Sequence, residues 1–139
     1  MPAQSLEAFL AQPLVAHLAT AGPTVTPIWF LWEDGAFWWL TGSWSQLATR
    51  LSSDPRASIV VDSCDLATGT VLSATARGVA EIVALDRDRA LRKLAKYLGP
   101  DQARWPQERF LAPLSDPSSR LARLVPRRTP VLRDLSFDL

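Results

Sequence analysis

The most constraining feature of the sequence is the dipeptide Asp34-Gly35, which lies between two apolar, aromatic segments, residues 24–33 and 36–41. Asp-Gly between such segments is the strongest short-range signal of a β-hairpin. A two-residue loop pairs Glu33 with Ala36 and sets the register of the whole hairpin. Successive side chains then point to opposite faces. One face carries Ile28, Phe30, Trp32, Phe37 and Trp39, and the other carries Trp29, Leu31, Trp38 and Leu40.

Both faces of this hairpin are apolar, whereas an antiparallel sheet with one face in water alternates apolar and polar residues. Residues 26–46 also hold five of the six tryptophans of the chain. One face can fill a barrel, and the other must be covered by a helix, a second subunit or a flat ligand. Pro27 cannot donate to a hydrogen-bond ladder, so the first strand is expected to have a free edge or a bulge there.

The remaining pattern predicts short strands with helices between them. Helices are expected over residues 5–11, 45–55, 86–100 and 101–113, with Ser5 and Asp86 as N-caps of the first and third. Further strands are expected over residues 14–20, 56–63, 70–84, 119–125 and 130–137, with Gly78 at a bulge or kink. Antiparallel strands with helices packed outside them predict a mainly β fold. We therefore expect a small β-barrel with peripheral helices, in a single domain of residues 1–139.

The composition excludes several classes of function. The formal net charge is +1, so no global field attracts nucleic acid or an anionic membrane. One cysteine, Cys64, and one histidine, His17, argue against a multi-ligand metal site. No uninterrupted apolar segment is long enough for a spanning helix, and the first residues lack the basic segment of a signal peptide. We therefore expect a cytoplasmic protein that binds no metal, nucleic acid or membrane.

The order of several short motifs resembles that of the flavin-binding split-barrel family, which includes pyridoxamine 5′-phosphate oxidase and its deazaflavin-dependent relatives. LATAGPTVTPIWFLWEDGAFWWLTG resembles the first hairpins of this family, and RLSSDPRASIVVD resembles its crossover from helix to strand. ARGVAEIV is similar to its long bulged strand, and RLVP to its closing strand. The resemblance extends over roughly residues 6–137 and implies an FMN-binding split barrel.

The resemblance also implies a homodimer with two cofactor sites at the subunit interface. The isoalloxazine ring would lie against the second strand, at Pro27, Ile28, Trp29 and Phe30. The implied cofactor is FMN, with the deazaflavin coenzyme as the alternative. The implied activity is transfer of a hydride or electrons between the cofactor and a small-molecule substrate. Because the cofactor carries such chemistry, no catalytic residue is identified from the sequence.

In this family, the segment after the third strand supplies hydroxyl and basic groups to the cofactor phosphate. The corresponding segment here reads LTGSWSQLATR, and the resemblance assigns cofactor binding to Leu40, Thr41, Ser43, Ser45, Gln46, Leu47 and Arg50. The family's lysine falls at or next to Leu47 and is absent, which removes a point charge from the phosphate site. Arg50 or the partner's Arg77 is the candidate replacement. The serines and threonines are equally well explained as turn and cap residues.

Other functions remain open. A tryptophan-lined groove without the lysine also suits a non-enzymatic protein that holds a flavin or a haem-type ring, and exposed apolar faces suit a purely interacting protein. His17 is interpreted as a structural or rim residue, and Cys64 as an unreactive thiol because Asp62 and Asp65 flank it. The basic residues of segment 87–96 are interpreted as a solvated helix face and not as a nucleic-acid patch. They are Arg87, Arg89, Arg92, Lys93 and Lys96.

Overall fold

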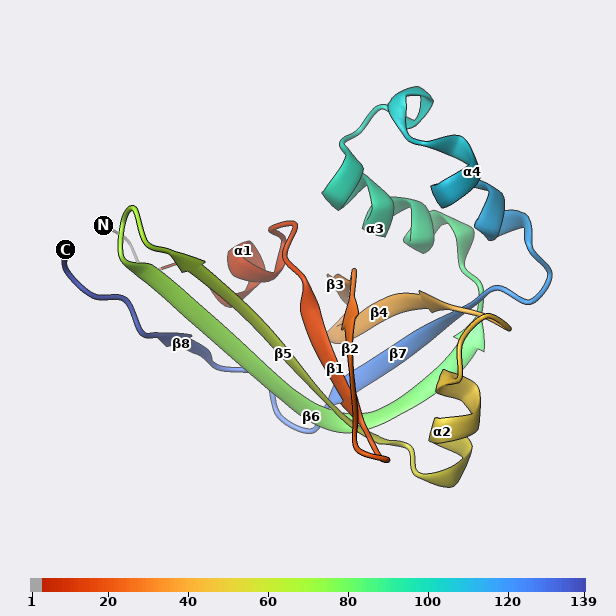
Figure 1. Cartoon of the computed structure of the whole chain (residues 1–139), viewed down its shortest axis with the longest axis horizontal. Helices are drawn as coiled ribbons and strands as arrows, with labels where there is room; N and C mark the ends of the chain where they lie inside the picture. The colour runs from red at the N-terminus through yellow and green to blue at the C-terminus, as the bar shows by residue number, and fades with distance from the viewer. Residues whose placement is uncertain (1–3) are drawn as a thin grey trace.

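The computed structural model describes residues 4–139, in which eight strands and six helical segments follow one another (Figure 1). The strands are β1 (Ala16–Thr20), β2 (Thr24–Ile28), β3 (Leu31–Glu33), β4 (Ala36–Thr41), β5 (Arg56–Asp65), β6 (Thr70–Ala84), β7 (Arg120–Pro126) and β8 (Leu132–Asp134). The helical segments are α1 (Leu6–Leu10), α2 (Leu47–Ser53), α3 (Arg87–Leu98), η1 (Gln102–Arg104), α4 (Gln107–Phe110) and η2 (Ala112–Ser115). The helix expected over 101–113 is thus three short segments, because Pro106 and Pro113 interrupt the helical hydrogen bonds.

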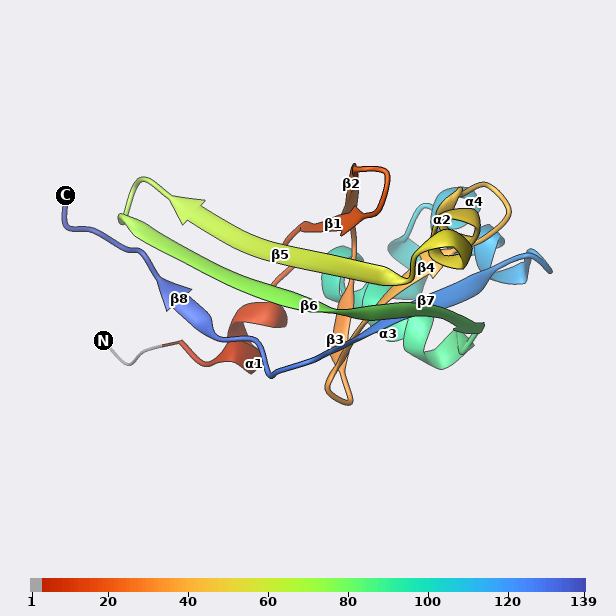
Figure 2. The same cartoon turned by 90° about the horizontal axis from the view of Figure 1, so that it is seen from below.

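The strands form one antiparallel sheet in the order β2–β1–β5–β6–β7–β4–β3, and β8 pairs with β6 beside this path. The longest strand, β6, pairs with β5 along its first part and with β7 from Gly78 to Ala84. The β5–β6 hairpin extends away from the rest of the sheet toward the chain termini, and α2 and α3 lie at the other end (Figures 1 and 2). The predicted class, mainly β with peripheral helices as in a split barrel, is confirmed.

The Asp34-Gly35 turn forms as predicted, with φ angles of 54° and 70°. The register of β3 and β4 is also as predicted: Glu33 with Ala36, Trp32 with Phe37, and Leu31 with Trp38. The prediction of a single strand over 24–33 is wrong, because the strand is interrupted at residues 29–30. The first part, β2, pairs with β1, and the second part, β3, pairs with β4. β2 is an edge strand of the sheet, as Pro27 led us to expect.

Helix α3 satisfies the backbone groups that the strand break leaves without a ladder partner. The amide of Phe30 donates to the hydroxyl of Tyr97 at 3.0 Å. The carbonyl oxygen of Phe30 accepts from Nζ of Lys96 at 2.9 Å, and the same ammonium donates to the carbonyl of Leu10 at 2.9 Å. A buried backbone group without a partner would destabilise the fold, so α3 makes the break possible.

The two apolar faces of the hairpin belong to two separate cores. Phe30, Phe37 and Trp39 are buried inside the sheet together with residues of α1, β5 and β6. Trp38 is buried on the outer face against α3, Trp105 and Leu114, and Trp29, Leu31 and Leu40 pack beside it. Of the coverings that the sequence left open for the outer face, the helix is therefore the one found. Trp44 is the exposed tryptophan, with 54% of its surface accessible.

The expected solvated basic face of α3 is wrong for three of its five residues. Lys93 is 6% exposed, and Lys96 donates to the two backbone carbonyls already described. Burial and, to a smaller extent, the nearby positive charge of Lys93 together lower the pKa of Lys96 to about 7. Arg89 keeps only 15% of its side chain exposed. The helix is amphipathic, but the long basic side chains border its apolar stripe and extend along the hairpin.

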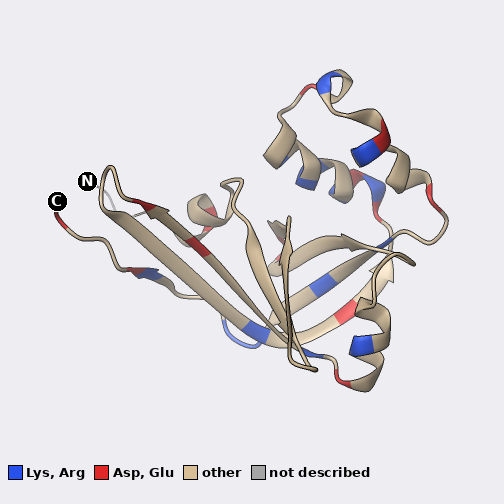
Figure 3. Ribbon diagram, viewed as in Figure 1, with Lys and Arg blue, Asp and Glu red and all other residues tan. Residues whose placement is uncertain are grey.

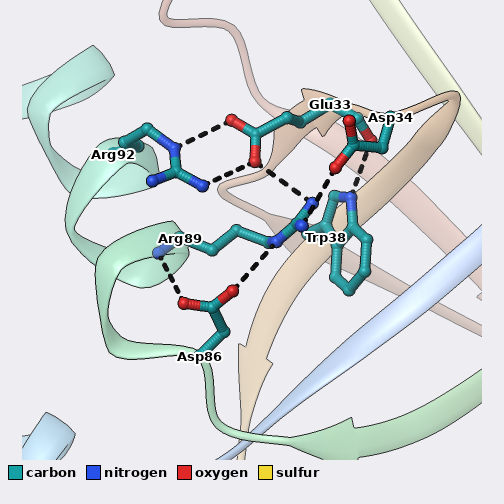
Figure 4. Close-up of polar contacts among 6 residues, drawn as sticks. All are labelled: Glu33, Asp34, Trp38, Asp86, Arg89 and Arg92. Carbon is teal, nitrogen blue, oxygen red and sulfur yellow. Dashed lines mark hydrogen bonds and ion pairs between the residues drawn. The ribbon is translucent and has the colours of Figure 1, made fainter.

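Arg89 is the centre of a network that joins α3 to the hairpin turn (Figure 4). Its guanidinium carbon lies 3.8 Å from the centre of the Trp38 ring. Its nitrogens lie 3.1 Å from Glu33, 3.0 Å from Asp34 and 3.5 Å from Asp86. The contacts to Glu33 and Asp86 have ion-pair distances without good hydrogen-bond angles, since Nη1 and Nε lack a hydrogen-bond partner. Elsewhere, charges of both signs are scattered over the molecule (Figure 3).

Gly78 does not form a bulge. The pairing of β6 with β5 continues through this residue, opposite Ala57, and its pairing with β7 begins here, opposite Pro126. A Cβ at position 78 would lie 2.5 Å from the carbonyl oxygen of Val125, so glycine is required by a close backbone approach. In the described residues, no helix is long and apolar enough to cross a membrane.

Candidate functional site

A cavity of about 440 Å³ lies between the edge strand β2, strand β4 and helix α2. We call it the β2–α2 cavity. Eight of the eleven residues that the resemblance assigned to cofactor binding line it: Pro27, Ile28, Leu40, Thr41, Ser45, Gln46, Leu47 and Arg50. Leu18, Thr26, Trp39 and Trp44 complete the lining. The volume is within the range of about 300–1,000 Å³ that is usual for ligand sites.

The local fold explains why these residues meet. β4 ends at Thr41, and the turn that follows returns the chain so that α2 begins at Leu47. The turn is held by Ser45, whose amide donates to the carbonyl of Gly42 at 3.0 Å and whose hydroxyl accepts from the amide of Leu47 at 3.1 Å. Ser45 thus has the turn role that the sequence left open, and it lines the cavity as well.

The lining divides into an apolar part and a polar part. Ile28, Leu40 and Trp39 offer apolar surface, while Thr41, Gln46 and Arg50 offer hydrogen-bond donors. Arg50 is the cationic residue of the lining, and its side chain is partly buried. An apolar wall next to a guanidinium and hydroxyl groups suits a flat ring that carries an anionic group.

Three of the assigned residues lie outside this cavity. Phe30 is fully buried in the barrel core, with 0% exposure. Ser43 forms a hydrogen bond with Ser118, with 2.9 Å between the two hydroxyl oxygens. The ring of Trp29 is stacked on Tyr97 at 4.3 Å and on Phe110 at 5.4 Å between centres, with interplanar angles of 2° and 5°. The indole of Trp29 is therefore stacked between protein rings outside this cavity, while Trp39 is among the residues that line it.

The position of the absent lysine is clearer in the structure than in the sequence. Leu47 is 3% exposed and belongs to the barrel core, so a lysine at this position would be buried. Gln46, its neighbour, is exposed and lines the cavity. Arg77 of the same chain lines a different cavity together with Arg56 and Arg127, and the replacement by the partner's Arg77 stays a prediction.

A second cavity, of about 530 Å³, opens on the other side of β4, between α3 and the segment of α4 and η2. We call it the α3–α4 cavity. Leu40 and Trp44 line both cavities, so the two are neighbours. Lys93 and Trp29 also line it. The sequence pattern did not indicate this site, because a basic run on an amphipathic helix is typical of a solvated face.

His17 and Cys64 take no part in either cavity. The imidazole Nδ1 of His17 lies 4.0 Å from Asp62, and 47% of the side chain is exposed. Cys64 is exposed near the end of β5. Among residues 4–139, no group of three or more histidine, cysteine or acidic side chains is placed to hold a metal ion.

With this geometry described, the comparison with known families identifies the class of protein. Residues 3–121 match the family model described as pyridoxamine 5′-phosphate oxidase. The chain therefore belongs to the pyridoxamine 5′-phosphate oxidase family. No curated protein matches the sequence.

Solved structures share the fold at low sequence identity. A conserved hypothetical protein of Mycobacterium tuberculosis, Rv2991, is 24% identical, with a TM-score of 0.68 over 96% of this chain and 86% of the other. An F420 reductase is 19% identical, with a TM-score of 0.58 over 95% and 98%. The haem storage protein HutZ of Vibrio cholerae is 18% identical, with a TM-score of 0.63 over 91% and 89%. These identities show a common fold and no more.

Proposed function

We propose that the β2–α2 cavity binds a flavin-type cofactor, FMN, and that the protein is an oxidoreductase acting on a small molecule. The observation that carries the proposal is the meeting of eight family-assigned residues around one cavity, in a chain that belongs to the pyridoxamine 5′-phosphate oxidase family. A bound flavin supplies hydride and electron transfer. The chain's own residues bind it: Ile28 and Leu40 contact the ring, and Arg50 and Thr41 bind the phosphate.

Two alternatives follow from the structural neighbours. The deazaflavin coenzyme F420 is favoured by the similarity to an F420 reductase. Haem binding without turnover is favoured by the similarity to a haem storage protein and by the absent lysine. Neither cavity is lined by the histidine or the cysteine, so neither offers an imidazole or thiolate to a haem iron. The chemistry of the lining therefore favours a flavin-type ring.

We also propose that the protein is a homodimer. The outer face of the hairpin no longer argues for a second subunit, because α3 of the same chain covers it. Support comes from apolar side chains elsewhere on the sheet. Val79 and Val125 are paired across β6 and β7 and are 55% and 54% exposed, and Val25 on the edge strand is 68% exposed. Exposed valines at paired positions are suited to contact with a second sheet.

A single chromatographic experiment tests both proposals. We expect the purified protein to elute at twice 15.3 kDa by light scattering, with a visible flavin spectrum under the same peak. Mass spectrometry after denaturation should identify the released compound as FMN. Release of F420 or haem would show that one of the alternatives is correct and that the FMN proposal is wrong. A colourless protein that binds none of the three compounds would refute a cofactor role. A mass near 15.3 kDa would refute the dimer alone.

A further inference from the structure

Lys93 is a buried lysine without a hydrogen-bond or ion-pair partner in the described part of the chain. The residue is 6% exposed, but its ammonium is not fully enclosed: among residues 4–139, the enclosed side-chain atoms without a hydrogen-bond partner are two nitrogens of Arg89. The ammonium is therefore reached from the cavity that it lines, and a charge in such a restricted position is stabilised by whatever occupies the cavity, water or a ligand. Lys96, one turn further along α3, has protein partners for its ammonium, since it donates to two backbone carbonyls. Lys93 has no such acceptor and lines the α3–α4 cavity.

The other lining residues of the α3–α4 cavity indicate which class of ligand it can bind. Trp29, Trp44, Phe110 and Leu40 form aromatic and aliphatic walls. The charged residues of the lining other than Lys93 are Glu108, Arg109 and Asp116, and all three are exposed. Asp116 already accepts from the amide of Ser118 at 2.8 Å. An ammonium between aromatic walls matches a planar ring with an anionic substituent.

The position of Trp44 connects this cavity to the proposed cofactor site. Its ring packs over the backbone at Gly42, where any Cβ would overlap it. Trp44 and Leu40 line both cavities, so a ligand in one lies next to a ligand in the other. Over half of the Trp44 surface is accessible, so this indole can contact a ligand in either cavity.

We propose that the α3–α4 cavity is the substrate site, and that it takes a planar aromatic carboxylate whose carboxylate accepts from Nζ of Lys93. The substrate part of this inference rests on the proposed function; the ligand class rests on the cavity itself. Burial lowers the pKa of Lys93 to about 8, so the group remains largely protonated at neutral pH and can donate to an anion.

The test uses 2-naphthoate and its neutral, isosteric amide as probes, with binding followed by tryptophan emission or calorimetry. We expect Lys93→Met to weaken 2-naphthoate binding by at least about ten-fold, because a charged hydrogen bond is lost. Binding of the amide should be unchanged, and the neutral methionine should raise the melting temperature. Arg87→Met is the matched control, because Arg87 lies on the same helix, is exposed and does not line the cavity, and it should change 2-naphthoate binding less than about three-fold.

Equal weakening of acid and amide by Lys93→Met would overturn the inference, as would a wild-type protein that binds neither at millimolar concentration. FMN titrations on the same samples separate this result from the proposed function. We expect FMN affinity to be the same in wild type and Lys93→Met. If the wild type does not bind FMN, the cofactor proposal is refuted. The proposed ligand class of the α3–α4 cavity is then still decided by the 2-naphthoate titrations.

Discussion

Replacement of Arg89 by methionine should lower the free energy of unfolding by about 1–2 kcal/mol, because it removes a mostly buried guanidinium from the Trp38 ring and from acidic partners that are themselves partly exposed. The variant loses the guanidinium over the Trp38 ring and the contacts to Glu33, Asp34 and Asp86. Glu33 would keep its bidentate bonds from Arg92 at 2.7 and 2.9 Å, which limits the loss. Urea unfolding should show a lower midpoint with an unchanged slope, since the change alters stability and not the surface exposed.

Arg87→Met is the control for this prediction, because Arg87 lies on the same helix and is exposed. We expect it to change stability by no more than about 0.5 kcal/mol. If both variants lose the same amount, helix charge in general would explain the effect. If Arg89→Met is as stable as the wild type, the network joining α3 to the hairpin turn contributes nothing to the fold.

The second large effect is expected at Arg50, the cation of the β2–α2 cavity. Charged hydrogen bonds contribute about 1.5–3 kcal/mol, so Arg50→Ala should weaken FMN binding by about ten-fold or more. Riboflavin lacks the phosphate, and its affinity should hardly change. Equal weakening of both ligands would mean that Arg50 only supports the fold. No weakening of either would place the phosphate on other groups, such as Ser45.

A gain of charge gives the converse test of the same site. Gln46 is exposed, lines the cavity and adjoins Leu47, so Gln46→Lys restores a point charge without burying it. We expect tighter FMN binding, with a larger gain at low salt because screening is weaker. Leu47→Lys should instead destabilise the protein, since it would place an ammonium in the barrel core. If Gln46→Lys has no effect on FMN, the phosphate does not lie near the start of α2.

Local signals in the sequence were sufficient for most of the fold. Asp34-Gly35 gave the hairpin and its register, and Ser5 and Asp86 cap their helices as predicted, accepting from the amides of Ala8 and Arg89. The split of residues 24–33 into two strands was not predictable. It depends on Tyr97 and Lys96, which reach the break from 67 and 66 residues away.

Contacts between residues far apart in the chain also explain which site residues could be predicted and which could not. The residues after β4 were assigned through the resemblance of this segment to the family's phosphate-binding segment, which is continuous in the chain. Lys93 was missed because a basic residue on an amphipathic helix usually reaches water. Only the packing of α3 under α4 and η2 shows that it is buried. Trp29 was assigned to the cofactor ring, but its indole stacks on Tyr97 and Phe110, which are distant in the chain, and it lines the α3–α4 cavity instead.

The most direct test of the central claim is hydrogen–deuterium exchange with and without FMN, since it locates the bound cofactor along the chain. FMN in the β2–α2 cavity should slow exchange in residues 41–50, where the turn and α2 border it, and in the edge strand β2. Residues 107–116, which border the α3–α4 cavity, should change little. Protection of 107–116 without protection of 41–50 would contradict the assignment of the cofactor to the β2–α2 cavity.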